Sequence, residues 1–435
     1  MEANIIETQY PLHFRKEETA ILGQLLKSRQ SVVLIGMKRV GISNFLRFFL
    51  YNQGIPKKYI TDGKRHLFIP IDLNDLIERE IFPFWTLTLK RIVDASLDSQ
   101  LSGKVKQKIE SLFVDSIQAH DLFLTIDNVR RSLVIIGENG MLPTLFFLRF
   151  DRMKDAVTPE LFANLQGLRD ATHHKLAYVF TSFRSLNILA PSVFTKASLS
   201  VFLQDVYIKP AQHSDIKTIY STYKQNYKLS LLPKVEQGLL DVVDGYVQYL
   251  QLSLILLHER KSQIKSKSEL FDYLLSDERI ALQSEELWEN LTEDEKHVLQ
   301  KISFGKSVLS IEKEKAIYLF DTGYITEKNN MRTVFSPLFD HYIREKNKRN
   351  SLGSPLIDFT KKEHLLFNML REHLDGICER EDIIVAVWPE VEAFGVSDWA
   401  IDRLIARIRK KMKLQKSPYM IQTVKTRGYR LVRVE

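Results

Sequence analysis

The stretch Val396-Ser-Asp-Trp-Ala-Ile-Asp-Arg-Leu-Ile-Ala-Arg-Ile-Arg-Lys-Lys-Met412 decides how the end of the chain folds. Ser397 is a good N-cap, and neither Gly nor Pro interrupts the residues after it, so the segment predicts a helix. Apolar residues recur at helical spacing and predict one buried stripe, formed by Ile401, Ile405, Ile408 and Met412. The basic residues then lie on another face and its flanks: Arg403, Arg407, Arg409, Lys410 and Lys411.

A short hairpin is predicted after this helix. Residues 419–424 form one strand, residues 425–428 the turn and residues 429–434 the returning strand. A basic helix followed by a basic-tipped hairpin can place the helix in the major groove of DNA and the wing beside it. The competing interpretation is a charged helix face that meets only solvent.

The distribution of charge favours DNA over that alternative. Residues 397–435 contain 11 Lys and Arg and 3 Asp and Glu, so their net charge of +8 equals the formal net charge of the whole chain. The basic excess is therefore concentrated in one small segment, as an electrostatic footprint for phosphates would be.

Short motifs in this region also resemble the OmpR/PhoB-type winged-helix domain of bacterial transcription regulators. The resemblance covers about residues 355–435. It rests on Asp358-Phe-Thr-Lys-Lys-Glu-His-Leu-Leu366, Val385-Ala-Val-Trp-Pro389, Ile401-Asp402, Arg407-Ile-Arg-Lys-Lys411, Ile421-Gln-Thr-Val424 and Arg427-Gly-Tyr-Arg430. It implies that the third helix reads the major groove and that the wing tip meets the minor groove.

Carried over by position, the resemblance makes Arg407 the main base-reading residue, Arg409 a phosphate contact and Lys425 the wing contact. The chain departs from the family pattern at Ala400, where a phosphate-contacting Thr is usual, and at Ala406, where a basic residue is common. The predicted DNA-binding set is Arg403, Arg407, Arg409, Lys410, Lys411, Lys425 and Arg427.

A second pattern lies near the N-terminus. Residues 31–35 are predicted as a buried strand, and Gly36-Met-Lys-Arg-Val-Gly41-Ile42-Ser43 precedes an apolar helix over residues 44–50. Strand, glycine loop and helix form the context of a phosphate-binding P-loop. Ile42 stands where that loop carries its phosphate-binding Lys, and an apolar side chain cannot supply the charge. One interpretation is a Gly-flanked turn that binds no ligand. If the loop does bind a nucleotide, the predicted contacts to it are Gly36, Lys38, Gly41 and Ser43.

Later strands fit the same fold. Residues 67–72 form a second strand, and residues 144–150 form a buried strand that leads into Asp151. An Asp in this place is Walker-B-like and would face Mg²⁺ if a nucleotide binds. The segment 175–180 forms another strand and leads to Arg184, a candidate sensor of the γ-phosphate.

Residues 10–280 resemble the AAA-like ATPases of the STAND and archaeal-ATPase type. Within this resemblance, residues 210–283 correspond to the helical lid, which keeps Gly245 of a Gly-x-Pro signature but has Val247 in place of Pro. Arg152 stands where hydrolytic relatives usually have an acid. Together with Ile42, these changes predict a degenerate domain that keeps the fold without hydrolysis. The sequence does not establish a cofactor; the candidate is ATP or ADP with Mg²⁺.

The predicted fold class is multidomain α/β plus α. The domains are a P-loop NTPase-like parallel α/β sheet (1–208), a helical lid (209–284), a winged helix of ATPase type (285–346), a linker (347–355) and an OmpR/PhoB-type winged helix (356–435). The composition, 44% hydrophobic and 27% charged, is that of a soluble globular protein. Neither a signal peptide nor a membrane span is evident, so we expect a cytoplasmic protein without a membrane partner.

The preferred function is a sequence-specific transcription regulator that binds double-stranded DNA. Its NTPase-like body would sense a signal or form a homo-oligomer. Two alternatives remain open at this stage. One is an active ATP-driven switch coupled to DNA binding, which Ile42 and Arg152 disfavour. The other is the DNA-binding subunit of a mobile-element or defence complex.

Overall fold

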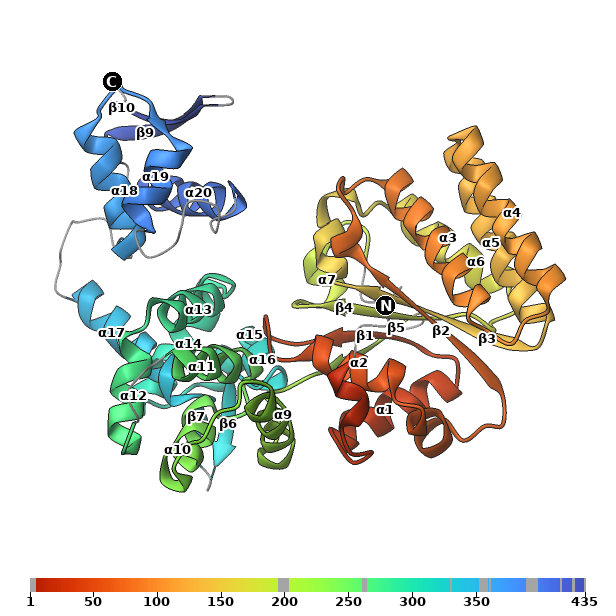
Figure 1. Cartoon of the computed structure of the whole chain (residues 1–435), viewed down its shortest axis with the longest axis horizontal. Helices are drawn as coiled ribbons and strands as arrows, with labels where there is room; N and C mark the ends of the chain where they lie inside the picture. The colour runs from red at the N-terminus through yellow and green to blue at the C-terminus, as the bar shows by residue number, and fades with distance from the viewer. Residues whose placement is uncertain are drawn as a thin grey trace. The chain divides into compact units, whose positions relative to one another are not determined.

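The computed structural model describes residues 5–194, 203–259, 264–328, 331–351, 359, 361–388, 398–414, 417–424 and 427–433. The chain divides into two compact units, residues 1–345 and residues 346–435 (Figure 1). No helix in the described residues is long and apolar enough to cross a membrane.

The first unit is built on a five-stranded parallel sheet in the order β2-β3-β4-β1-β5. The strands are β1 (Ser31–Ile35), β2 (Arg65–Asp72), β3 (Met141–Leu148), β4 (Ala177–Ser182) and β5 (Leu203–Tyr207). Every residue of β1 and β4 is buried, because helices cover both faces of the sheet. The predicted parallel α/β sheet is confirmed.

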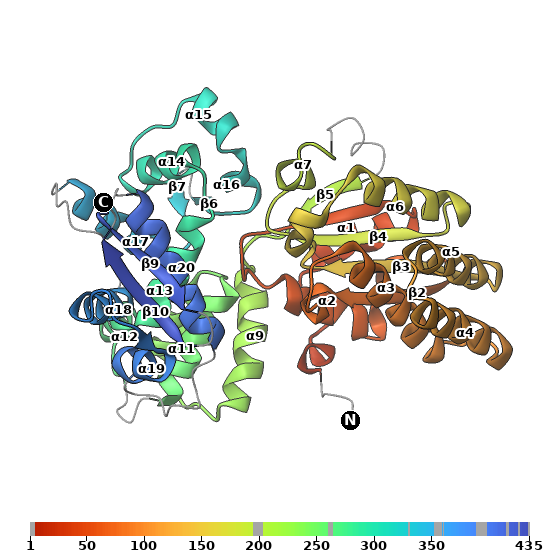
Figure 2. The same ribbon diagram turned by 90° about the horizontal axis from the view of Figure 1, so that it is seen from above.

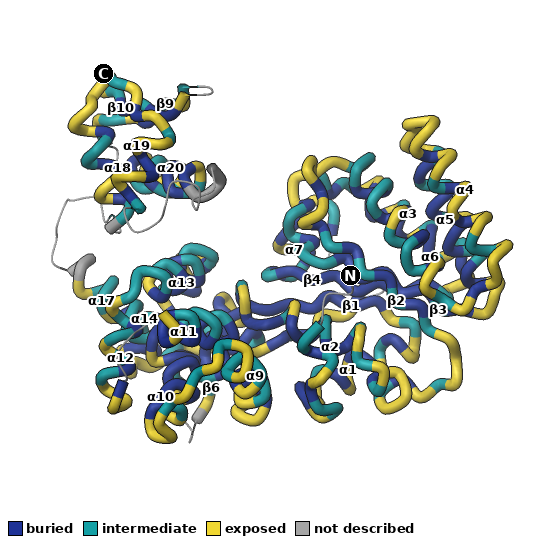
Figure 3. Tube along the Cα trace, viewed as in Figure 1, coloured by how far each residue is buried: buried dark blue, intermediate teal, exposed yellow. Residues whose placement is uncertain are grey.

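Two groups of helices enclose this sheet (Figure 1). One face carries α1 (Lys16–Lys27) and α2 (Ile42–Tyr51). The other, seen from above in Figure 2, carries α3 (Ile81–Leu97), α4 (Gly103–Ala119), α5 (Leu122–Glu138) and α6 (Pro159–Ala171); a short α7 (Leu186–Leu189) follows β4. The buried strands form the centre of the fold (Figure 3). There the Phe147 ring stacks on those of Phe84, Tyr178 and Phe180.

The end of β3 differs from the prediction. The strand stops at Leu148, because Arg149 has a left-handed backbone (φ 60°) and its N–H donates to Thr181 Oγ1 at 2.6 Å. Asp151 lies beyond this turn, in the 3₁₀ helix η4 (Phe150–Ala156). The expectation that the strand leads directly into Asp151 was therefore wrong: Arg149 is the first residue after it.

Helices make up the next part of the first unit. The lid comprises α9 (His213–Asn226), α10 (Pro233–Val243), α11 (Val247–Glu259), α12 (Lys267–Ser276) and α13 (Glu278–Glu289). A winged helix follows, with α14 (Glu293–Ser303), α15 (Ser310–Lys315), α16 (Ile317–Asp321), the hairpin β6 (Ile325–Lys328) and β7 (Met331–Val334), and α17 (Pro337–Ser351). The side chains of Thr292 and Glu295 form a capping box at the start of α14. Residues 347–351 are helical where a turn-rich linker was predicted.

The second unit is a compact winged helix. It contains α18 (Lys361–Glu372), β8 (Cys378–Glu379), α19 (Arg380–Val387), α20 (Asp398–Leu414), β9 (Tyr419–Val424) and β10 (Gly428–Arg433). Its antiparallel sheet has the order β8-β10-β9. The predicted helix and hairpin are confirmed as α20 and β9–β10, and the predicted stripe of Ile401, Ile405, Ile408 and Met412 is buried.

Residues 346–435 are expected to fold alone, because their apolar side chains form a core of their own. Leu370→Ala on α18 should then lower the unfolding free energy of this fragment by about 2–5 kcal/mol, since Leu370 is fully buried in that core. Leu365→Ala on the same helix is the control and should change it by less than about 0.5 kcal/mol, because Leu365 is exposed. Urea denaturation followed by circular dichroism measures both; equal losses would contradict the independent core.

Candidate DNA interface and phosphate-loop site

The open face of α20 is narrower than the sequence predicted. Its exposed side chains recur at helical spacing and are Asp402, Ala406, Lys410 and Lys413. The other predicted DNA-binding residues of this helix are only partly exposed: Arg403, Arg407, Arg409 and Lys411. Lys410 and Lys413 are therefore its most accessible cations. Lys413 was missed because it lies three residues after Lys410, beyond the motif that carried the resemblance.

Arg407 does not lie on the open face, so that expectation was wrong. Its side chain is only 18% exposed, and its Nε lies 3.0 Å from Oε1 of Glu363 on α18. Lys411 Nζ lies 2.6 Å from the other oxygen of this carboxylate. Because Glu363 is fully buried, its charge must be balanced inside the protein, and these two cations do so.

Two further contacts join α20 to the wing. Arg409 donates from Nε to the carbonyl oxygen of Ile421 at 3.0 Å and from Nη2 to Thr423 Oγ1 at 2.8 Å, both on β9. Near the start of the helix, Tyr429 of β10 donates a hydrogen bond to Asp402, which lowers the pKa of that carboxyl. The helix is thus held to the hairpin at two points.

The turn at the tip of the wing contributes one described cation, Arg427. The Arg427 side chain is 63% exposed, and its Nη2 lies 3.7 Å from Glu379 Oε1. An exposed ion pair at this distance is weak, so the guanidinium can exchange partners readily. Lys425, the other predicted wing residue, lies outside the described residues.

The lid closes directly over the glycine loop of the first unit. Gly41 has φ 109°, and a Cβ at this position would lie 2.7 Å from Cγ2 of Val247. The Tyr246 hydroxyl donates to the backbone oxygen of Lys38 at 2.6 Å. Val247, which stands in place of the signature Pro, therefore packs on the loop itself.

The two cationic side chains of the glycine loop, Lys38 and Arg39, contact the helical lid. Arg39 Nε lies 3.0 Å from Glu286 Oε2 on α13, and Lys38 Nζ lies 3.9 Å from the other oxygen. Lys38 also stands over the ring of Phe183, 5.0 Å from its centroid. The predicted phosphate contact Lys38 thus has two partners within the protein.

Arg184, the candidate γ-phosphate sensor, is bound to the first winged helix. Both Nη atoms donate to Glu295 of α14, at 2.6 and 2.7 Å, and Nη2 also donates to the backbone oxygen of Asn290. The guanidinium lies 3.7 Å from the centroid of the Tyr318 ring. Burial alone would lower the pKa of Arg184, but the bonds to Glu295, together with the charges of Glu295 and the neighbouring tyrosines, raise it above its ordinary value. In this structure Arg184 joins the sheet to the winged helix.

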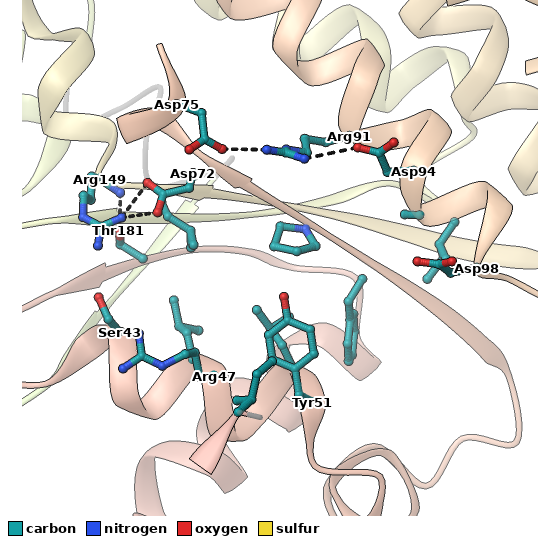
Figure 4. A pocket seen from close by; sticks show the side chains of 18 of the residues that line it. Ser43, Arg47, Tyr51, Asp72, Asp75, Arg91, Asp94, Asp98, Arg149 and Thr181 are labelled. Carbon is teal, nitrogen blue, oxygen red and sulfur yellow. Dashed lines mark hydrogen bonds and ion pairs between the residues drawn. The ribbon is translucent and has the colours of Figure 1, made fainter. Parts of the chain in front are cut away.

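A groove of about 610 Å³ opens beside the edge strand β2, between α2 and α3 (Figure 4). Its lining at the carboxyl ends of the strands includes Ser43, Asp72, Arg149 and Thr181. The Arg149 guanidinium donates to both oxygens of Asp72. Ser43 and the Arg149–Asp72 ion pair therefore line the same groove. Sequence reasoning missed Arg149, although the apolar run of β3 ends immediately before it.

Asp151, the predicted magnesium ligand, is not among the residues that line this groove. Burial raises the pKa of its carboxyl, and nearby Lys38 and Arg149 lower it only in part. Asp151 thus lies near the cations Lys38 and Arg149 and outside the lining of the groove.

Sequence reasoning also missed Arg15, a buried cation beside the glycine loop. Its side chain is 1% exposed, and Nη1 is paired with Glu18 at 2.8 Å. Within the described residues Nη2 has no hydrogen-bond partner, and it lies 3.9 Å from the Cβ position at Gly41. Arg15 is thus placed to supply some of the charge that Ile42 cannot.

Residues 353–431 match the protein family described as "Transcriptional regulatory protein, C terminal". The C-terminal winged helix is of the OmpR/PhoB type. A search of the curated proteins gave no match for the chain.

Three solved structures illustrate what the chain as a whole is similar to. The Walker-type ATPase PABY2304 of Pyrococcus abyssi is 16% identical, with a TM-score of 0.48 over 76% of this chain and 95% of that one. The ORC2 protein of Aeropyrum pernix, in ADPNP–ADP complexes, is 11% identical, with a TM-score of 0.48 over 79% and 98%. The ORC1 protein of A. pernix in complex with DNA is 10% identical, with a TM-score of 0.39 over 99% and 91%. The P-loop fold assignment rests on the sheet and loop described above.

Arg407→Ala should destabilise the OmpR/PhoB-type domain by about 1–3 kcal/mol, because Glu363 would remain buried with Lys411 as its remaining described cation. Lys410→Ala on the open face is the control and should stay within about 0.5 kcal/mol of the parent. Urea denaturation of the fragment 346–435 measures both. Two equally stable variants would show that Arg407 does not support the fold.

Glu295→Gln should lower the unfolding free energy of the full chain by about 3–5 kcal/mol, because it leaves Arg184 buried without its counter-charge. Gln keeps the length and the capping box, so the change isolates the charge. Glu293→Gln, two residues earlier and 90% exposed, is the control and should have almost no effect. Thermal and denaturant unfolding compare the three proteins; a loss from Glu293→Gln of the same size would refute the role of the pair.

Proposed function

We propose that this protein is a sequence-specific DNA-binding transcription regulator whose N-terminal body is a degenerate, non-hydrolysing P-loop NTPase fold. The observation that carries the proposal is the second unit, in which an OmpR/PhoB-type winged helix presents Lys410 and Lys413 along one exposed helix stripe. Its partner is double-stranded DNA, met by α20 and the wing.

The DNA-binding residues have different roles in this proposal. Lys410, Lys413 and the wing residues Lys425 and Arg427 meet phosphates, since exposed flexible cations suit that contact. Arg403 lies at the side of the open stripe and reads bases where its guanidinium reaches the groove edge, whereas Arg407 is held on Glu363 and supports the helix. Arg409 and Lys411 hold the helix to β9 and α18 and add to the positive potential.

The body binds ATP or ADP weakly at most and does not turn it over. Ile42 removes the lysine that stabilises phosphate charge, and the Arg149–Asp72 pair lines the same groove as Ser43. Gly36, Gly41, Ser43 and Arg15 remain to hold a phosphate through backbone N–H groups and charge. The body thus acts as a sensor and a homo-oligomerisation module of a cytoplasmic regulator.

Replacing Lys410 and Lys413 with Gln should lower the affinity for cognate and scrambled duplexes alike. Each change should reduce the salt slope of log K by about one unit, because each lysine releases about one counterion when it meets a phosphate. Arg371→Gln, an exposed cation at the end of α18, is the matched control and should leave the slope unchanged. Titrations at several salt concentrations, after the target is found by genome-wide occupancy mapping, make the comparison. Unchanged slopes for both lysine variants would remove α20 as the DNA-facing element.

Purified protein should show no ATP hydrolysis above that of a Ser43→Ala variant, because the loop lacks the charge that stabilises the transferred phosphoryl group. The release of inorganic phosphate at saturating ATP and Mg²⁺ measures this, and retained nucleotide is measured separately in denatured samples. Robust turnover that disappears in Ser43→Ala would instead support the active ATP-driven switch.

A further inference from the structure

One carboxylate of the lid contacts both cations of the glycine loop. Glu286 lies on α13, and its Oε2 is 3.0 Å from Arg39 Nε while its Oε1 is 3.9 Å from Lys38 Nζ. The Glu286 side chain is 15% exposed, whereas those of Lys38 and Arg39 are 32% and 46% exposed. The acid is thus largely covered, while the two cations that reach it stay open to solvent.

The lid also holds the backbone of the same loop segment. The Tyr246 hydroxyl, which donates to the carbonyl oxygen of Lys38, accepts a hydrogen bond from Gln283 Nε2 at 2.9 Å. Gln283 lies three residues before Glu286 on α13, so both side chains leave the same face of that helix. Arg39, between these contacts, has a left-handed backbone with φ 61°, which a non-Gly residue keeps only where its surroundings hold it. The lid therefore helps to set the conformation of the loop.

This loop contact differs from the ion pair that joins β4 to the first winged helix. The side chains of Arg184 and Glu295 are 8% and 4% exposed, so breaking that pair would leave charges buried without a partner. Lys38 and Arg39 would instead regain water if Glu286 released them, because both are partly exposed. The loop contact can therefore open while the Arg184–Glu295 pair stays in place.

A phosphate bound at the loop would compete with Glu286 for these cations. Gly41 is the N-cap of α2, and the first N–H groups of a helix have no partner within it, so this helix start favours an anion. Lys38 and Arg39 are the cations nearest to the helix start in the sequence. Their contact with Glu286 offsets their charge, and the carboxylate adds a negative charge that opposes a phosphate.

We propose that Glu286 is an autoinhibitory latch, which holds the glycine loop against the lid and competes with the phosphates of ATP or ADP for Lys38 and Arg39. The inference rests on the proposed function, in which the body keeps a weak capacity to bind nucleotide. It adds a second reason for that weakness beside Ile42, because a carboxylate of the chain itself already contacts the two loop cations. When the latch opens, Lys38 and Arg39 turn to the phosphates and the loop leaves the lid.

The test compares the full-length wild type with Glu286→Gln, which keeps the size of the side chain and removes its charge. Glu289→Gln is the matched control, because Glu289 lies three residues later on the same helix and makes no ion pair with the glycine loop in the described residues. Arg39→Gln breaks the same contact from the other side. Isothermal titration calorimetry with ATP or ADP and Mg²⁺ measures affinity, and amide hydrogen exchange of residues 36–43 measures how often the loop opens.

Glu286→Gln should bind both nucleotides about tenfold more tightly than the wild type, since one charge close to a phosphate changes affinity by about this factor. Its loop amides should exchange faster than those of the wild type without nucleotide, and more slowly once ATP is added. Arg39→Gln should also speed the exchange but should gain no affinity, because a cation for the phosphates is lost together with the latch. A contact with a merely structural role would make the two variants behave alike, and Glu289→Gln should match the wild type.

A folded Glu286→Gln protein that binds ATP and ADP no more tightly than Glu289→Gln would overturn the latch. If circular dichroism shows that Glu286→Gln does not fold, Glu286→Ala repeats the test, since Ala also removes the charge and favours the helix. ATP hydrolysis by Glu286→Gln would contradict the non-hydrolysing body of the proposed function and leave the latch standing. Absence of the affinity gain, without hydrolysis, would contradict the latch alone.

Discussion

The buried ion pair between Arg184 and Glu295 is the contact on which the first unit depends. It joins the end of β4 to the start of α14, over a sequence separation of 111 residues. A buried pair of this kind gains little over an apolar contact but costs much when one partner is lost. Loss of Glu295 would lower the stability of the protein further, because its side chain also completes the capping box of α14. This charge balance acts together with the apolar core that the sheet and the winged helix share, and both fix the two parts to each other.

The same use of charge recurs around the glycine loop. In a working P-loop enzyme, cations near the loop are left for phosphate and metal. In this chain Arg39 bonds Glu286, Arg149 bonds Asp72 and Arg184 bonds Glu295, so protein carboxylates take the place of ligand charges. The lid adds Val247 directly against Gly41. These contacts, in which polar groups of the loop region bond to the protein itself, are the basis for proposing a scaffold rather than a catalyst.

Local patterns predicted the elements well. Alternation of buried runs with Gly and Pro turns predicted β1 and β4, and the spacing of Ile401, Ile405 and Ile408 predicted the buried stripe of α20. These features depend on residues close in sequence, where period and capping act directly. The parallel sheet followed from the order of the strands along the chain.

Predictions about single polar side chains failed where a residue far away in the sequence determines the position of the side chain. Arg407 has the spacing of an exposed residue, yet Glu363 on another helix draws it inward. Asp151 follows an apolar run, yet the left-handed turn at Arg149, held by Thr181, moves it out of the groove. Neither partner is visible in a sequence window, because each is brought close only by tertiary packing.

The buried Glu363 also explains how α20 can present so few cations and still serve DNA. A helix that carries many arginines would need each of them in solvent if nothing inside balanced their charge. Glu363 balances the charges of Arg407 and Lys411, and Arg409 donates a hydrogen bond to β9. These contacts fix the rotation of the helix about its axis. The exposed stripe of Lys410 and Lys413 is then held in one orientation, as the proposed contact with DNA requires. Preorganisation of this kind lowers the entropy lost on binding, so the internal contacts contribute to recognition without touching DNA.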